Sequence, residues 1–442
     1  MPKQDSVEKN FHLFLEFFLY YNQILEFLLM KGRKKFFTIL ILGLLSSIGP
    51  LSIDMYLPGF PDIAKDLHST VGYISLSLSS FFIGISFGQL LYGPLLDRFG
   101  RKKPLYIGLI IYLLASIGCA MATTANALIA LRLLQALGGC VGMVASRAMV
   151  RDLFAVSDNA KVFSLLMLVV GVSPIIAPTL GGYVTAAFGW QSVFIILTFL
   201  AVFIIVAIHF ALPESREPDP TFSLRPRQIL SNFGKVFIQP QFYTYCFTGS
   251  IASAGLYAYI AGSPYVFMEI FHVSEKIYGW IFAFVAAGLI ASSQLNSLLL
   301  RKYSSEQIIK VALFCQSLTG LFLLGGSYLG LLGLYSTIFL CFIFLSCQGF
   351  TFPNTSALSL APFSKTAGSA SALLGGIQMG IGAFTSAAVS YFSNHTAIPM
   401  AIIMAICAVT AFCILLVGRK IIYKKATIAE VEEEAADMWI TT

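Results

Sequence analysis

Apolar and polar residues along this chain are segregated into long blocks. Twelve runs of about 20 mostly apolar residues are separated by short polar or Pro/Gly-containing breaks. A run of that length crosses a ~30 Å hydrocarbon core as a helix, because a helix rises about 1.5 Å per residue. The predicted membrane spans are 36–59, 71–95, 104–122, 126–149, 160–186, 191–212, 241–269, 276–299, 308–328, 332–353, 366–392 and 397–417.

One long polar stretch, residues 213–240, divides these spans into two groups of six with similar lengths and spacing. Such symmetry is typical of transporters built from two repeats. We therefore predict an all-α polytopic membrane protein. It would comprise a six-helix bundle at 36–212, a cytoplasmic linker at 213–240, a second six-helix bundle at 241–417 and a cytoplasmic tail at 418–442.

The first 35 residues form an N-terminal extension that fits no span. The apolar stretch Phe11–Leu29 is interrupted by Glu16, Asn22 and Glu26, and it lacks the features of a signal peptide. Two interpretations stay open: an amphipathic segment on the membrane surface, or translation that begins at Met30.

Basic residues predict the orientation of the spans. They concentrate in alternate loops, as at Arg98–Lys103, Arg225–Arg227 and Arg419–Lys425, whereas the intervening loops offer only Lys65 and Lys276. Because loops rich in Lys and Arg stay on the cytoplasmic side, we expect both termini to be cytoplasmic.

Composition excludes several classes of protein. The chain is 57% hydrophobic and 11% charged, whereas soluble domains contain about 25% charged residues, so a soluble enzyme is excluded. The basic loops account for the net charge of +7 and no nucleic-acid partner is expected. The HExxH motif of zinc proteases and the phosphate loop of ATP-driven pumps are absent from the sequence. We expect neither an enzyme, nor a metal site, nor a cofactor.

Two ionisable residues stand out because charge within a span is costly. Asp54 lies four residues before Pro58, about 6 Å from the outer end of the first span. Arg132 lies six residues after Asn126, about 9 Å from the same face. Gln135 shares the helix face of Arg132.

These depths predict that Asp54 and Arg132 face one cavity. In the functional interpretation, Asp54 exchanges a proton and Arg132 tunes its affinity, since a nearby cation favours the carboxylate and burial disfavours it. The alternatives are a permanent structural pair, or an Asp54 that caps its helix near the interface.

A second motif follows the second span: Gly93-Pro94-Leu95-Leu96-Asp97-Arg98-Phe99-Gly100-Arg101-Lys102-Lys103. We interpret it as a loop in which glycines permit a tight turn and Asp97 bonds either to a helix N-terminus or to Arg151. The simpler interpretation is a positive topology signal.

The fifth span contains the stretch Gly171–Gly182 with Pro174, Pro178, Gly181 and Gly182. Each proline removes a helical hydrogen-bond donor, and the glycines allow close helix approach. A hinge and the ordinary packing of a bent helix are both open interpretations.

These motifs resemble a known family. Pro50–Pro58 reads P-L-S-I-D-M-Y-L-P, a stretch of the bicyclomycin-resistance (Bcr/CflA) group of twelve-span drug:proton antiporters in the major facilitator superfamily. Residues 93–103 resemble the superfamily's motif between the second and third spans. Arg132–Gly138 resembles R-x-x-Q-G-x-G, and Ala177–Gly182 resembles the antiporter motif G-P-x-x-G-G. The resemblance covers about 36–418.

Ala136 and Ala177 stand where these patterns have glycine. The resemblance implies two bundles that rock around a central cavity and expose it to each side in turn. It implies that Asp97 and its neighbours, Arg98 and Arg101 among them, latch the outward-open state. It also implies that Arg132 takes part in proton coupling.

The function expected from this resemblance is export of small organic compounds by a monomer, driven by the proton gradient. A proton-coupled importer of a metabolite on the same fold is the alternative. Aromatic and neutral polar groups would suit uncharged or weakly charged substrates, although each is also explained by packing. These cavity candidates are Tyr56, Tyr257, Tyr259, Asn354 and Gln378.

Overall fold

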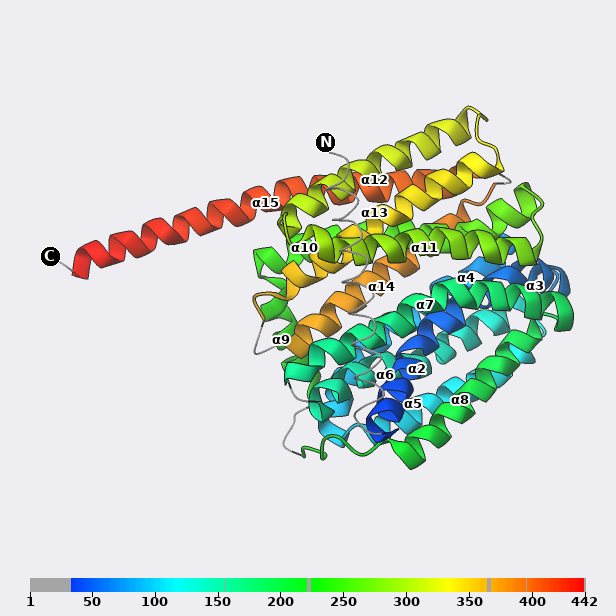
Figure 1. Cartoon of the computed structure of the whole chain (residues 1–442), viewed down its shortest axis with the longest axis horizontal. Coiled ribbons are helices and arrows are strands. Elements are labelled where there is room, and N and C mark those ends of the chain that lie inside the picture. The colour runs from blue at the N-terminus through cyan, green and yellow to red at the C-terminus, as the bar shows by residue number, and fades with distance from the viewer. Residues whose placement is uncertain (1–32, 155, 221–223, 364–366, 395, 441–442) are drawn as a thin grey trace, which may run out of the picture.

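The computed structural model describes residues 33–154, 156–220, 224–363, 367–394 and 396–440, which form helices and short connections (Figure 1). The predicted N-terminal extension lies almost entirely outside the described residues. The long helices of the first half are α2 (Arg33–Asp54), α4 (Val71–Phe99), α5 (Lys102–Ala120), α6 (Ala125–Leu153), α7 (Val156–Phe188) and α8 (Gln191–Ala211). Those of the second half are α10 (Pro240–Pro264), α11 (Glu275–Leu299), α12 (Ser305–Tyr328), α13 (Leu334–Leu360), α14 (Ala367–Tyr391) and α15 (Ile398–Ile440).

Short elements join these helices. A 3-10 turn (Leu57–Gly59) and α3 (Phe60–Asp66) follow α2, a π-helical turn (Tyr265–Ile270) follows α10, and α9 (Pro226–Phe237) lies in the linker. Local sequence explains several helix starts. The hydroxyls of Thr70 and Thr124 accept hydrogen bonds from backbone N–H groups in the first turns of α4 and α6, as N-cap residues do.

Eleven helices in the described part of the chain are long and apolar enough to cross a membrane. Among the long helices described, α10 is not apolar enough to meet this criterion, although its 25 residues are sufficient to span a bilayer. Its Thr244, Thr248, Ser250 and Ser253 are buried, and it packs against α13, α14 and α15. Because α10 turns its polar side chains toward protein, it completes a set of twelve spanning helices.

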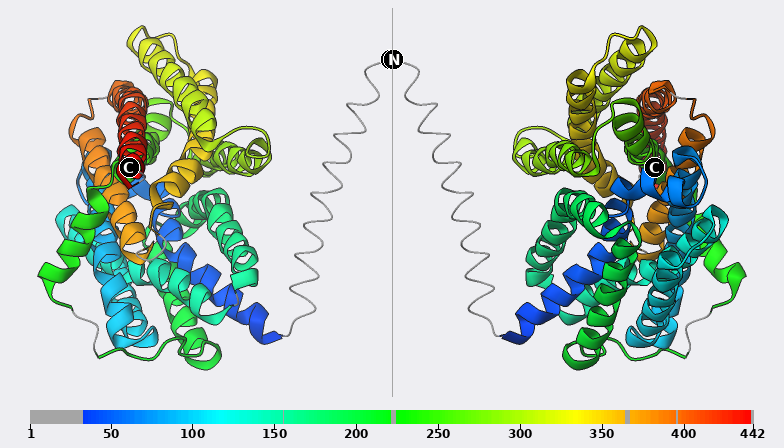
Figure 2. Two further views of the ribbon diagram at one scale, coloured as in Figure 1. Left: turned by 90° about the vertical axis from the view of Figure 1, so that its left-hand side faces the viewer. Right: turned by 90° about the vertical axis from the view of Figure 1, so that its right-hand side faces the viewer.

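The two halves repeat the same packing scheme. In the first half α4 packs on α6, α6 on α5, α5 on α8 and α2 on α7. In the second half α11 packs on α13, α13 on α12, α12 on α15 and α10 on α14. The halves join through α4 with α14 and α7 with α11, and Figure 2 shows the bundles side by side. The predicted fold of two six-helix bundles is confirmed.

One predicted boundary needs correction. The stretch 93–103 is not a loop throughout, because α4 continues through Gly93 and Pro94 to Phe99. The turn lies at Gly100, whose φ of +80° is a conformation that favours glycine. At the other end of the chain, α15 includes nearly all of the predicted last span and continues through the predicted tail to Ile440.

Candidate functional site

Arg132 lies in the centre of the first bundle and is completely buried. Its Nη1 donates to Oε1 of Gln135 at 2.6 Å, and its Nη2 donates to the backbone carbonyl of Ser52 at 2.9 Å. Gln135 Nε2 in turn donates to the Ser116 hydroxyl at 2.8 Å, and the hydroxyl of Ser52 bonds that of Tyr112 at 2.7 Å. These contacts tie α2, α5 and α6 together around one guanidinium.

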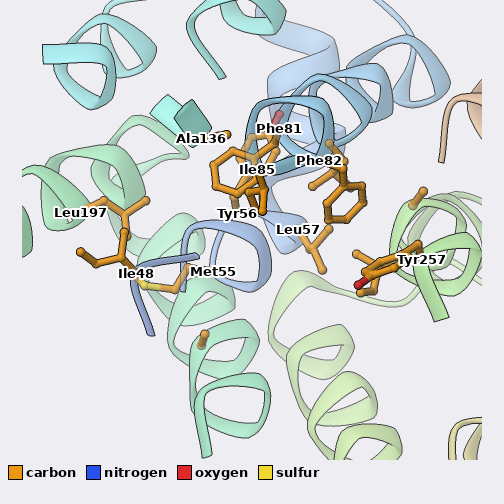
Figure 3. Close-up of a cluster of buried hydrophobic side chains, with 14 of the residues drawn as sticks. Ile48, Met55, Tyr56, Leu57, Phe81, Phe82, Ile85, Ala136, Leu197 and Tyr257 are labelled. Atoms are coloured by element: carbon orange, nitrogen blue, oxygen red, sulfur yellow. The ribbon is translucent and has the colours of Figure 1, made fainter. Parts of the chain in front are cut away.

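Aromatic rings cover the faces of the same guanidinium. Its central carbon lies 4.1 Å from the ring centroid of Phe81, 4.6 Å from that of Tyr56 and 5.8 Å from that of Phe194. Figure 3 shows Phe81 and Tyr56 in the surrounding cluster of buried side chains. Cation–π contacts of this kind stabilise a desolvated arginine. Arg132 is therefore held by a carbonyl, an amide and ring faces.

Asp54 does not pair with Arg132, contrary to the predicted shared site. It is the last residue of α2 and is 4% exposed, and its carboxyl group makes no hydrogen bond or ion pair with any residue in the described part of the chain. Arg132 instead contacts the Ser52 carbonyl, two residues earlier. Asp54 lies within electrostatic range of Tyr278 on α11, and the turn after it packs on α7, α10 and α11. The carboxyl group thus lies where the two halves meet.

The glycines of the fifth span form part of this junction. A Cβ atom added to Gly181 would overlap the carbonyl oxygen of Met55, and one added to Gly182 would lie 2.5 Å from that of Glu275. Across the contact, a Cβ on Gly279 would lie 2.7 Å from the carbonyl oxygen of Pro178. Glycines here let α7 approach α2 and α11 backbone to backbone. Pro174 and Pro178 lie within one continuous helix, α7.

Serine hydroxyls continue the junction along α4 and α14. Ser79 Oγ donates to Ser386 Oγ at 3.0 Å, and Ser390 Oγ donates to Ser75 Oγ at 2.9 Å. Ser86 Oγ donates to the carbonyl of Gly376 at 2.7 Å. We name the end of the molecule that carries Ser75, Ser390 and Gly182 the closed end. A small cavity of about 20 Å³, lined by Val71, Ser75 and Val389 among others, lies there.

The opposite end, which carries α9 and the turn at Gly100, is here named the linker end. Arg101, 3% exposed, donates from Nη1 to Asp97 at 2.9 Å and from Nε to Asp152 at 2.8 Å. Burial alone lowers the pKa of Arg101, but hydrogen bonds and charges from Asp152 and Asp97 outweigh it and raise the pKa. Arg101 therefore stays cationic at any physiological pH.

The linker completes this charge cluster with residues that the motif does not contain. Arg216 donates from Nη1 to Asp97 at 3.1 Å. Glu214 accepts from the backbone N–H groups of Arg101, at 2.7 Å, and Lys102 at the start of α5, where a negative charge is favourable. Asp97 thus has partners other than the expected Arg151. Sequence patterns do not identify Glu214 or Arg216 as part of this cluster, because more than 110 residues separate each from its partner.

Arg98 also belongs to the predicted latch. Its Nη1 donates to the backbone carbonyl of Asp219 at 3.4 Å. A cavity of about 500 Å³ opens beside this cluster. Its walls come from α4, α6, α9 and α14, and they include Gly93, Asp97, Arg101 and Arg151. The linker end therefore holds a cavity of about 500 Å³, whereas the cavity described at the closed end measures only about 20 Å³.

The five predicted substrate residues lie elsewhere, and none of them lines this cavity. Tyr56 bonds Ser77 and faces Arg132, Tyr259 packs on Phe282, and Tyr257 packs on Phe82 with ring centroids 4.8 Å apart. The last pair joins the two halves (Figure 3). Asn354 donates to Asn296 at 2.7 Å and Gln378 to Ser253 at 3.2 Å. Their role in substrate binding stays a prediction.

Comparison with known proteins agrees with this architecture. The family model described as Major Facilitator Superfamily matches residues 40–387. A bicyclomycin resistance protein homolog of Haemophilus influenzae is 31% identical over 86% of this chain and 95% of its own length. Multidrug resistance protein D of Escherichia coli is 26% identical over 79% of this chain and 87% of its own. The resemblance to the bicyclomycin-resistance group is confirmed.

Solved structures show the same fold at low sequence identity. A bacterial homolog of the human lysosomal transporter Spinster, in an inward-facing and occupied conformation, has a TM-score of 0.67 and 15% identity, with 88% of this chain and 98% of that chain covered. A D-xylose–proton symporter gives a TM-score of 0.67 and 13% identity, with 86% and 97% covered. On sequence and fold together, the chain belongs to the Major Facilitator Superfamily.

Proposed function

We propose that this protein is a monomeric exporter of small organic compounds in the bacterial inner membrane and that it exchanges them for protons. The names of its relatives, a bicyclomycin resistance protein homolog and a multidrug resistance protein, support export of drug-like compounds. The basic loops support a cytoplasmic linker end and cytoplasmic termini. The large cavity would then open to the cytoplasm, which is the side from which an exporter loads.

The observation that carries the proton-exchange part is the position of Asp54. It is buried at the closed end, and no cation in the described part of the chain pairs with it. An anion buried without a partner is costly, so closure at this end favours a carboxyl group that holds a proton. Separation of α7 from α11 would open the junction beside Asp54 and admit water. Proton occupancy and conformation would thereby be linked at one residue.

Arg132 has a different role in this proposal. Its fixed contacts with Gln135, Ser52 and the aromatic rings position the end of α2, and Asp54 lies two residues after its carbonyl partner. Arg132 is therefore proposed as a positioning residue for the proton-binding carboxyl group.

Replacement of Asp54 tests the proposal. In cells lacking their own efflux pumps, wild-type protein should lower the accumulation of at least one compound in a drug panel, and a protonophore should abolish that effect. We expect Asp54→Asn to reduce gradient-driven export about tenfold or more, the range of typical coupling energies. Exchange of labelled for unlabelled compound across proteoliposomes should persist in the variant, since it requires no net proton movement.

Asp62→Asn is the matched control, because Asp62 is a partly buried carboxylate on α3 at the same end. It should retain gradient-driven export. Full pH-dependent export by Asp54→Asn would contradict the proposal, and proton-coupled uptake by the wild type would identify an importer instead.

A further inference from the structure

The cavity at the linker end is strongly basic. Its charged lining residues are Asp97, Arg101, Arg147 and Arg151, so three positive charges face one negative charge. Arg147 and Arg151 are four residues apart on α6 and therefore share one helix face. The two arginines therefore lie on the same wall of the cavity.

The nearby carboxylates are already engaged. Asp97 accepts hydrogen bonds from Arg101 and Arg216, and Asp152 accepts from Arg101 and from the Ser215 hydroxyl. By contrast, Arg147 and Arg151 form no hydrogen bond or ion pair with any residue that the structure describes. Among the described residues, therefore, none neutralises the positive charge of this wall.

Arg147 is exposed and lines this cavity. Its side chain is accessible to solvent and lies at the wall of the space between α4, α6, α9 and α14. An unpaired guanidinium directed into a protein-lined space is suited to bind an anion, since fewer waters compete there than at the surface.

The opposite wall adds groups that favour an anion. It consists of the first turns of α14, with Gly368, Ser369 and Ser371. The N-terminus of a helix carries partial positive charge, and serine hydroxyls donate hydrogen bonds. Asn232 of α9 provides an amide at the same cavity. A volume of about 500 Å³ accommodates a drug-sized molecule.

We infer that Arg147 and Arg151 bind the anionic group of the transported compound, a carboxylate, phosphate or sulfonate, when it enters from the linker end. This inference rests on the proposed function and narrows its substrate class to organic anions and zwitterions. It differs from the expectation of uncharged substrates, which was based on tyrosine and amide side chains outside this cavity. The head group of an anionic lipid offers the same oxyanion chemistry, so the experiment separates the two sources.

The test uses purified full-length protein with fluorescein, an aromatic dianion, and a cationic rhodamine ester of the same ring system. Binding is followed by fluorescence anisotropy in phosphatidylcholine nanodiscs, with and without phosphatidylglycerol. We expect Arg147→Gln combined with Arg151→Gln to weaken fluorescein binding about tenfold or more, because each lost contact is charge-assisted. Rhodamine binding should be unchanged or tighter.

Lys103→Gln combined with Lys235→Gln is the matched control, since it removes two exposed positive charges from the linker end that do not line the cavity. It should leave fluorescein affinity unchanged. Thermal unfolding and gel filtration verify that each variant is folded, and Arg147→Lys with Arg151→Lys should restore part of the affinity.

Equal fluorescein affinity of the wild type and the double glutamine variant would overturn the inference. It would also be overturned if phosphatidylglycerol displaced fluorescein through the two arginines while wild-type proteoliposomes failed to transport fluorescein, because the site would then bind lipid. Failure of the proposed function has a different signature. Arginine-dependent fluorescein binding and transport would remain, but without any dependence on the proton gradient.

Discussion

Different kinds of contact stabilise the two ends of this transporter. At the closed end, glycines bring α7 against the backbone of α11, and serine hydroxyls link α4 to α14. At the linker end, Arg101 binds Asp97 and Asp152, Arg216 also binds Asp97, and a cavity remains beside them. The cavity volumes, about 20 and 500 Å³, reflect this difference.

The difference indicates how each end can be perturbed. Contacts between backbones tolerate no added volume, because neither side can move a flexible side chain away. Ion pairs with carboxylates that are partly exposed depend on charge and on salt. The closed end should therefore respond to the size of a side chain, and the linker end to its charge.

The largest effect is expected from Gly182→Ala. Its methyl group would lie 2.5 Å from the carbonyl oxygen of Glu275, so closure of the halves should cost about 3 kcal/mol, the upper part of the range for overpacking. That corresponds to a shift of roughly a hundredfold toward conformations open at this end. Maleimide labelling of Val389→Cys, buried at the closed end, in a cysteine-free background should rise accordingly.

Gly171→Ala provides the control on the same helix, because a Cβ there meets no atom within 4 Å. It should leave labelling unchanged. If both variants labelled alike, the close approach at Gly182 would not be what limits the opening of this end.

Arg101→Gln should have a smaller effect, which acts through charge on the stability of the protein. The change leaves Asp97 and Asp152, whose side chains are 33% and 19% exposed, without their shared partner. We expect a loss of about 2 kcal/mol in stability, less than for a fully buried pair because water reaches both carboxylates. Thermal unfolding in detergent should show the difference, and high salt should reduce it.

Lys103→Gln is the control. It also removes one positive charge, but from an exposed position three residues after Gly100. Its unfolding temperature should match that of the wild type at every salt concentration. A salt-independent loss in Arg101→Gln would instead indicate that packing of the arginine stem, and not its charge, stabilises this end.

Much of this architecture could be predicted from sequence, because a lipid environment requires long apolar helices. The glycines at 181 and 182 were also predictable as places of close approach. Ala136, which replaces a family glycine, is accommodated by Gly84 on α4, where an added Cβ would lie 2.6 Å from that of Ala136. Hydropathy does not reveal such pairwise compensation.

The contacts within the candidate site were harder to predict from sequence than the fold. Depth along two helices placed Asp54 and Arg132 at similar heights, but depth does not specify rotation about the helix axis. The rotation of α2 directs the Ser52 carbonyl to Arg132 and leaves Asp54 near Tyr278. Glu214 and Arg216 were missed for a related reason, since only the folded path of the linker brings them to Arg101 and Asp97.

The smallest expected effect concerns a single hydroxyl contact at the closed end. Ser79→Ala removes the donor to Ser386, a residue with 0% exposure, and should cost the closed conformation about 1 kcal/mol. Labelling of Val389→Cys should rise about fivefold, well below the effect of Gly182→Ala. Ser336→Ala, at an exposed helix start on α13, should not change this labelling.

The double variant Ser79→Ala, Ser386→Ala separates two explanations. If the cost of the single variant comes from an unsatisfied buried hydroxyl, removal of both hydroxyls should restore most of the closure. If the two losses simply add, the hydroxyls stabilise the closed end independently, and packing volume alone would not explain how this end is held shut.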